Sequence, residues 1–143
     1  MSRDLSLQSA RADDHLALVL LRVLTGAFYL PHVLSKIVGF AGTVVFFGKA
    51  GFHPPEFFVI FSGSLELLVG LALIFGVLTK YAAIVSAGLM VVAAYATIVV
   101  KGPGWYWNVG GIEYLIFWGL ASLIVFVSEW KRAPGLLGFF KSW

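Results

Sequence analysis

The stretch FFVIFSGSLELLVGLALIFGVLTKYAAIVSAGLMVVAAYATIVV, residues 57–100, decides the fold. It holds two apolar runs, Phe57 to Leu78 and Tyr81 to Val100, which only Thr79 and Lys80 separate. Each run is close to the ~20 residues that a helix needs to cross roughly 30 Å of hydrocarbon. The alternation of apolar and polar residues that is typical of a membrane β-barrel is absent. The stretch therefore predicts two transmembrane helices joined by a short turn.

Two further apolar runs flank this stretch, about Leu16 to Val38 and Val109 to Ser128. Of the 143 residues, 60% are hydrophobic and 12% are charged, whereas soluble domains carry about 25% charged residues. We therefore expect an all-α membrane protein, with one transmembrane domain (1–143) built as a four-helix bundle. The apolar, glycine-rich connection of residues 39–56 is predicted to be a re-entrant or interfacial segment.

Basic residues outside the spans predict the orientation, because Lys and Arg gather on the cytoplasmic side. One side of the membrane would carry Lys49 and Lys101, and the other would carry Arg3, Arg11, Lys80, Lys131, Arg132 and Lys141. Both termini are therefore predicted to be cytoplasmic, with residues 1–15 as a retained cytoplasmic segment and residues 131–143 as an interfacial tail. The net charge of +3 is attributed to topology and contact with the lipid bilayer, so no nucleic-acid partner is expected.

The charged residues inside the spans are candidates for a site, since each costs roughly 2.5–3.5 kcal/mol at a helix centre and should face the bundle interior. At helical spacing, one face of the first span carries Arg22, Gly26, Tyr29, Val33 and Lys36, with His32 on its flank. The other spans contribute Glu66 and Glu113. From their depths we predict an Arg22–Glu66 pair at mid-membrane and a cluster of Glu113, His32 and Lys36 toward the outer side.

Two interpretations of these charges stay open at this point. They form a functional pocket, or they only fix the register of the helices. Trp105 and Trp107, between the third and fourth spans, either belong to an aromatic belt at the headgroups or roof a pocket in which a flat ring stacks. The chain has no cysteine and shows no phosphate loop, nucleophile elbow or zinc signature, so thiol chemistry and a metal site are not expected.

Three motifs, R…G…PHVLSK, SGSLELLVGLALIFGVLTKYAAIV and WNVGGIEYLIFW, resemble the DoxX family of small four-helix bacterial membrane proteins over about residues 16–130. The positions that match the family pattern are Arg22, Gly26, His32, Lys36, Gly63, Glu66, Gly70, Gly76 and Lys80. The chain departs from the family where HG-x-x-K reads HVLSK, with Val33 in the glycine position, and where the C-terminal S-L-D is missing. The resemblance implies a multi-pass protein of the bacterial cytoplasmic (inner) membrane.

The resemblance does not imply one activity, because DoxX relatives are described as the membrane subunit of thiosulfate:quinone oxidoreductase, as partners of redox-defence enzymes and as assembly factors. Our leading hypothesis is a subunit of a quinone-linked oxidoreductase that anchors a redox partner and is not catalytic alone. His32 or Glu113 would exchange protons with the quinone, and the residues that would bind it are Arg22, Lys36, Glu66, Trp105 and Trp107. The only cofactor expected is a quinone, and the electron carrier would come from the partner.

Two other hypotheses remain. The alternative from a different class is a non-catalytic assembly or stabilising subunit that binds another membrane protein. A small transporter is disfavoured because four helices without inverted repeats leave little room for alternating access, although a homo-oligomer would weaken that objection.

Overall fold

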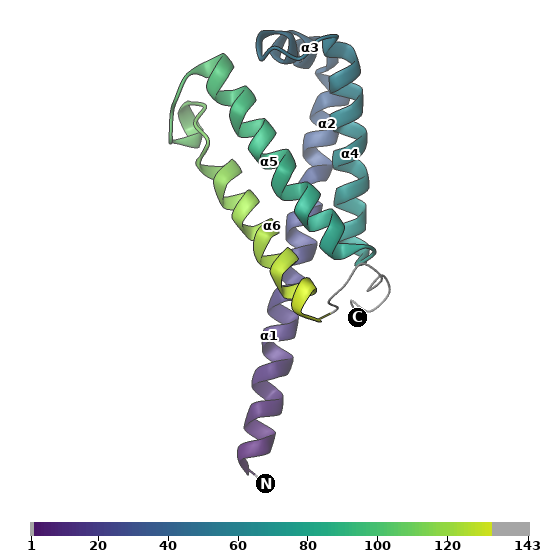
Figure 1. Ribbon diagram of the computed structural model, residues 1–143, viewed down its shortest axis with the longest axis vertical. Coiled ribbons are helices and arrows are strands. Elements are labelled where there is room, and N and C mark those ends of the chain that lie inside the picture. The colour runs from purple at the N-terminus through teal and green to yellow at the C-terminus, as the bar shows by residue number, and fades with distance from the viewer. Residues whose placement is uncertain (1, 133–143) are drawn as a thin grey trace.

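A computed structural model describes residues 2–132, with side chains described from Asp14 onward. Its helices are α1 (Ser2–Ala27), α2 (Tyr29–Val38), α3 (Phe40–Lys49), α4 (Pro55–Phe75), α5 (Thr79–Lys101), the 3-10 turn η1 (Trp107–Val109) and α6 (Glu113–Arg132) (Figure 1). Within these residues there is no strand. The helical stretches long and apolar enough to cross a membrane are Asp14–Val38, Pro55–Phe75, Thr79–Lys101 and Glu113–Arg132. The predicted all-α membrane fold with four spans is thus confirmed, while most of the predicted tail, 131–143, lies outside the described residues.

The first span is divided at Phe28, where we expected one uninterrupted helix. The cause is Pro31, which has no N–H to donate to the carbonyl of Ala27 and whose ring crowds the preceding turn. The Phe28 N–H still bonds to the Leu24 carbonyl at 3.1 Å, and α2 continues in nearly the direction of α1 (Figure 1). The polar residues predicted as a separate N-terminal segment belong to α1, which projects beyond the other helices.

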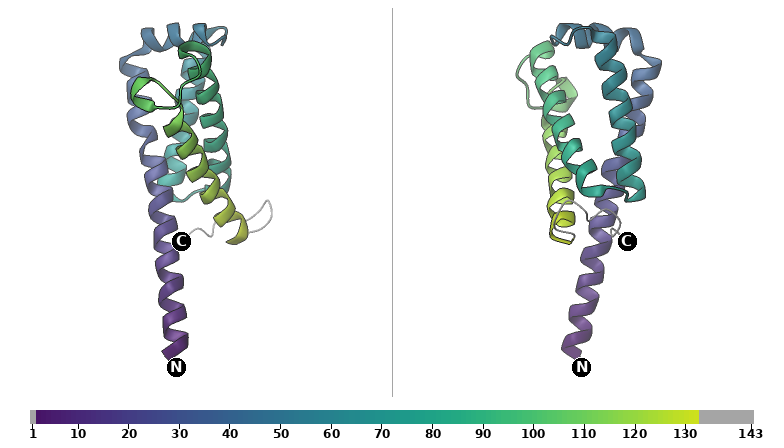
Figure 2. Two further views of the ribbon diagram at one scale, coloured as in Figure 1. Left: turned by 90° about the vertical axis from the view of Figure 1, so that its left-hand side faces the viewer. Right: turned by 45° about the vertical axis from the view of Figure 1, so that its right-hand side comes forward.

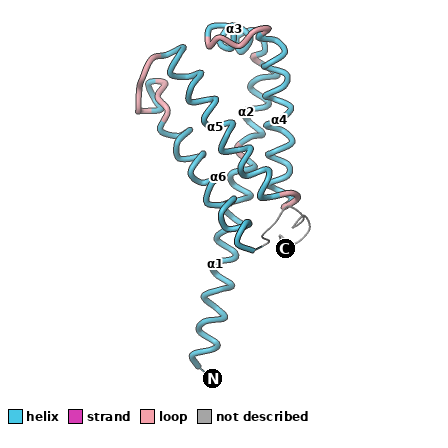
Figure 3. The backbone as a smooth tube through the Cα atoms, viewed as in Figure 1, coloured by secondary structure: helices cyan, strands magenta, loops and turns pink. Residues whose placement is uncertain are grey.

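The connection predicted to be re-entrant or interfacial contains α3, which lies across one end of the bundle instead of along it (Figure 2). We call this end the α3 end. The opposite end holds the short connection between α4 and α5, and we call it the turn end. This connection is as tight as the sequence predicts: α4 ends at Phe75 and is capped by Gly76, whose φ of 71° is left-handed, and α5 begins at Thr79. Apart from the break at Phe28, the loops lie at the two ends of the bundle (Figure 3).

The fourth span begins four residues later than the sequence suggested, at Glu113 instead of Val109. Residues 107–109 form η1, and Gly110 follows it with a φ of 87°, a conformation that a helix cannot continue. The Gly111 N–H then bonds back to the Tyr106 carbonyl at 2.8 Å. Glu113 is consequently the first residue of α6 and does not lie a turn inside the span.

The four spanning helices enclose a core that begins close to the turn end. Its buried members are Tyr29, Val69, Leu73, Ala82, Ala83, Met90, Leu115, Trp118 and Val125. α5 packs mainly on α6, and α1 packs on α4 and α6. From their shared turn, α4 and α5 diverge toward the α3 end (Figures 1 and 2). Apolar side chains such as Phe117 cover the outer surfaces, as expected where lipid is the solvent.

Candidate functional site

The register between the first span and α4 decides which charged residues meet. These helices are antiparallel, and they come closest where Gly26 meets Gly70: a Cβ added to Gly26 would lie 2.6 Å from the Gly70 carbonyl oxygen. Residues before Gly26 therefore face residues after Gly70, and residues after Gly26 face residues before it. Small residues that let two backbones approach are a common way of packing membrane helices.

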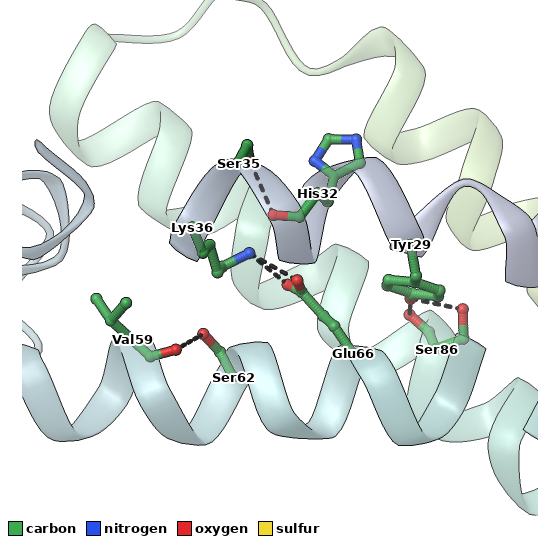
Figure 4. Close-up of polar contacts among 8 residues, drawn as sticks. All are labelled: Tyr29, His32, Ser35, Lys36, Val59, Ser62, Glu66 and Ser86. Atoms are coloured by element: carbon green, nitrogen blue, oxygen red, sulfur yellow. Dashed lines mark hydrogen bonds and ion pairs between the residues drawn. The ribbon is translucent and has the colours of Figure 1, made fainter. Parts of the chain in front are cut away.

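Lys36 and Glu66 form an ion pair across this contact (Figure 4). The Lys36 Nζ lies 2.8 Å from one Glu66 carboxylate oxygen and 2.6 Å from the other, so it donates to both. Both side chains are largely buried, with 16% and 12% of their surface exposed. The pair thus brings an ammonium and a carboxylate together between α2 and α4.

The predicted Arg22–Glu66 pair is therefore wrong. Arg22 precedes Gly26 by one turn, so its guanidinium lies against Gly76 in the position that a Cβ of that residue would take. Gly76 and Glu66 are ten residues apart, or ~15 Å of helix, which an arginine side chain does not span. The prediction failed because it aligned the midpoints of the two spans, whereas the Gly26–Gly70 contact sets their actual register.

Arg22 belongs instead to a second charged cluster at the turn end. Arg22 is 2% exposed, and Lys80 and Glu129 are also buried. Glu129 lies 3.5 Å from Arg132, and the Lys80 Nζ lies 5.2 Å from the centre of the Trp130 ring, in cation–π geometry. The contact between Lys80 and Trp130 links α5 to α6, and the contact of Arg22 with Gly76 links α1 to the end of α4.

The predicted cluster of Glu113, His32 and Lys36 does not form among the described residues. Lys36 is paired with Glu66. His32 points away from that pair (Figure 4), and its ring centre lies 5.3 Å from that of Trp118 on α6. Glu113 is at the first turn of α6, where its backbone N–H bonds to the Trp105 carbonyl. His32 thus meets α6 at Trp118, which is five residues, or ~7.5 Å of helix, beyond Glu113.

A cavity of about 650 Å³ lies between these helices, on the side of the bundle toward α3. The ionisable side chains that line it are Tyr29, His32, Lys36, Glu66, Lys101 and Tyr114. Its aromatic wall consists of Phe46, Phe47, Phe52, Phe58, Phe61 and Trp118. A polar pair inside a mostly apolar cavity is the usual composition of a small-molecule site.

A series of hydroxyl contacts begins at Tyr29, one of the residues that line the cavity. The Tyr29 hydroxyl lies 2.8 Å from the Ser86 Oγ (Figure 4), and the Ser86 Oγ lies 2.8 Å from the Ser122 Oγ. The Ser122 hydroxyl donates to the Trp118 carbonyl oxygen at 2.9 Å. This series joins α2, α5 and α6 and fixes the position of Trp118. Its indole N–H is buried and has no acceptor among the described residues.

The tryptophans predicted to roof a pocket do not line this cavity. Trp105 and Trp107 are 57% and 65% exposed, and the wall nearest α3 comes from phenylalanines such as Phe47 and Phe52, whose ring centres are 5.5 Å apart. Arg22 and Glu113 are likewise outside the lining residues. The site roles given to these four residues stay predictions, while Lys36, Glu66 and His32 share one cavity.

Sequence reasoning missed Tyr29 and Trp118 as cavity residues. A signal for Tyr29 was present, because it shares a helix face with Lys36. Trp118 ends the motif WNVGGIEYLIFW, but nothing in a sequence says that this tryptophan, and not Trp105 or Trp107, faces the interior.

Comparison with known proteins agrees with the resemblance in sequence. The family model DoxX matches residues 17–100, which contain Lys36 and Glu66 and the cavity walls from α2, α4 and α5. A protein of Bacillus subtilis (strain 168) named "Putative oxidoreductase CatD" is 36% identical over 85 residues, which are 59% of this chain. The matched region spans 61% of that protein's length. No solved structure matches the chain.

Proposed function

The chain belongs to the DoxX family, and from this premise we propose that it is the integral membrane subunit of a quinone-linked oxidoreductase complex. The family and the name of the relative support the coarser statement, a multi-pass membrane protein associated with oxidoreductase activity. The observation that carries the finer proposal is the Lys36–Glu66 pair inside an apolar, aromatic cavity. We place the protein in the bacterial cytoplasmic membrane, where quinones are dissolved in the lipid.

The cavity suits a quinone in size and in chemistry. Its volume of about 650 Å³ lies within the range of roughly 300–1,000 Å³ that is usual for small-molecule sites. A quinone is a flat ring with two carbonyl oxygens, so it needs aromatic contacts on its faces and hydrogen-bond donors at its edge. Phe61 and Trp118 are among the aromatic residues of the wall, and the Lys36 ammonium is a charged donor beside them.

The reduction of a quinone to a quinol consumes two electrons and two protons. In our proposal Lys36 donates a hydrogen bond to a ring oxygen and stabilises the negative charge that develops there. Glu66, held 2.6 Å from Lys36, keeps the ammonium in place, and His32, which also lines the cavity, delivers protons to the ring oxygens during reduction. The electrons come from a partner subunit with its own redox cofactor, which this chain would anchor.

One observation favours the alternative of a non-catalytic assembly subunit. The Tyr29–Ser86–Ser122 contacts and the contact between Lys80 and Trp130 at the turn end join helices to one another, as polar groups that fix register would do. The two proposals differ in what His32→Ala does. If the cavity is a reaction site, this substitution lowers turnover while the abundance of the complex stays normal. If His32 only supports assembly, the substitution lowers the abundance of the complex.

The proposal is tested by purifying the tagged protein gently from its native membrane and identifying co-purifying proteins and extracted quinones in the same sample by mass spectrometry. The variants are Lys36→Met, which removes the donor in the cavity, and Lys49→Met, a control on α3 outside the cavity lining. We expect a redox subunit and bound quinone with the wild type and the control, and less quinone with Lys36→Met. A non-redox partner, or equal quinone in all three samples, contradicts the proposal.

A further inference from the structure

One side of the cavity is bordered by apolar residues that are also exposed. Val85, Gly88 and Val92 lie on one face of α5, since steps of three and four residues return to the same face of a helix. All three line the cavity and all three are exposed, as is Phe61 on α4. The cavity therefore continues to the outer surface between α4 and α5, where the two helices diverge (Figure 2).

Gly88 is the residue that leaves space in this gap. A Cβ added to Gly88 would meet no atom within 4 Å. Gly26 and Gly70, in contrast, each face a backbone carbonyl at 3.0 Å or less. Close packing of helices thus explains Gly26 and Gly70 but does not explain Gly88.

Gly88 and the ion pair lie at the same depth. Glu66 is ten residues before Gly76, and Gly88 is nine residues after Thr79, so each is ~14–15 Å from the turn end. That is about half of the ~30 Å hydrocarbon thickness. A ring bound at Glu66 would face a lateral opening near the bilayer centre, a region with no water for a polar substituent.

We infer that the ligand of the cavity is a quinone with a long apolar chain, and that this chain leaves the bundle between α4 and α5 across Gly88. The inference rests on the proposed function, and it names the class of quinone and the residue that selects it. The ring lies at Lys36 and Glu66, while Phe61, Val85 and Val92 border the chain. A bulky side chain at position 88 fills the opening, and a ring that carries a chain can then no longer be seated.

The test uses the full chain in lipid nanodiscs and two probes with the same ring, decylubiquinone and the parent benzoquinone without the decyl chain. The variant is Gly88→Phe, and the control is Val91→Phe, at an exposed position of α5 that does not line the cavity. Dissociation constants are measured by quenching of tryptophan fluorescence, corrected for partition into empty nanodiscs. Gly88→Ala, which adds one methyl to open space, reports whether loss of the glycine itself matters.

We expect Gly88→Phe to weaken binding of decylubiquinone about tenfold or more and to leave binding of the chainless ring unchanged. Val91→Phe and Gly88→Ala should bind both probes as the wild type does. Equal effects of Gly88→Phe on the two probes, or no effect on either, overturn this inference alone. Failure of the wild type to bind either probe contradicts the proposed function as well.

Discussion

Lys36 and Glu66 show how two residues that a membrane disfavours become acceptable there. Each alone would cost roughly 2.5–3.5 kcal/mol at a helix centre, but as a pair they neutralise each other with two short hydrogen bonds. The lysine stem passes over Gly63: a Cβ added there would lie in ordinary van der Waals contact with the Lys36 Cδ, at 3.6 Å. The pair is also open to the cavity, which a purely structural pair does not require.

Breaking this pair should destabilise the protein more than removing both charges. We expect Lys36→Met and Glu66→Leu each to lower the free energy of unfolding by about 1–3 kcal/mol, because each leaves an uncompensated charge in an apolar site. The double variant should recover part of that loss. Thermal unfolding in detergent, read as a double-mutant cycle, gives the coupling. A coupling energy near zero would show that the two side chains do not interact as described.

Gly76 should tolerate substitution less well than Gly88. Its φ is 71°, and the Arg22 guanidinium occupies the place of a Cβ, so Gly76→Ala meets both backbone strain of ~1 kcal/mol and a clash. Gly88 is helical with open space around it, where alanine favours the helix. We expect a lower unfolding temperature for Gly76→Ala and an unchanged or higher one for Gly88→Ala. The reverse order would argue against the placement of Arg22.

At the scale of single residues, the sequence identified the residues that face the interior. It was less successful in predicting which of them form pairs. Spacing and cost identified Arg22, Lys36 and Glu66 as residues that face the interior, and each is buried or largely buried. A shift of a few residues between the first span and α4 decides whether Glu66 meets Arg22 or Lys36. The close contact between Gly26 and Gly70 sets that register, and hydropathy does not report it.

At the scale of elements, single residues set the helix boundaries, whereas a hydropathy window averages over many residues. Pro31 divides the first span at Phe28, and Gly110 delays α6 until Glu113. Both residues could be read from the sequence, but an apolar window smooths over a single proline or glycine. Glu113 lies apart from His32 because α6 meets His32 at Trp118, five residues further along the helix.

The contact between α1 and α4 should depend on Gly26. A leucine there would place its Cβ 2.6 Å from a backbone oxygen and 2.9 Å from the Leu73 Cβ, so the two helices would have to separate. We expect Gly26→Leu to abolish the monodisperse peak in size-exclusion chromatography. Gly42→Leu, on α3 with nothing within 4 Å of the added Cβ, is the matched control and should keep it. A normal profile for Gly26→Leu would contradict the described packing.

At the scale of the whole molecule, the bundle is closed at the turn end and hollow toward α3. Arg22, Lys80 and Glu129 are buried at the turn end, while the cavity occupies the space that opens as α4 and α5 diverge. The sequence predicted the fold class, the four spans and the separate segment between the first two spans, which contains α3. It could not predict the cavity, because its volume depends on the angles between helices, which side chains far apart in sequence determine together.

The orientation in the membrane remains a prediction that the chain makes easy to test, since it contains no cysteine. Excess Lys and Arg near the turn end predict that both termini are cytoplasmic. Single cysteines at Lys49 and Lys131 should therefore differ in intact cells. A membrane-impermeant maleimide should label Lys49→Cys and should reach Lys131→Cys only after the membrane is permeabilised. The opposite pattern would invert the topology.

The central claim is that the cavity of Lys36 and Glu66 binds a quinone, and photolabelling tests it most directly. A photoreactive azidoquinone with an apolar chain is illuminated with the protein in nanodiscs, and the labelled peptides are identified by mass spectrometry. We predict label on cavity-lining residues of α4 and α5, such as Phe61, Leu65, Leu89 or Ala93, and its loss when unlabelled quinone competes. Label spread over outer positions such as Phe117, or label that excess quinone does not displace, would contradict the account.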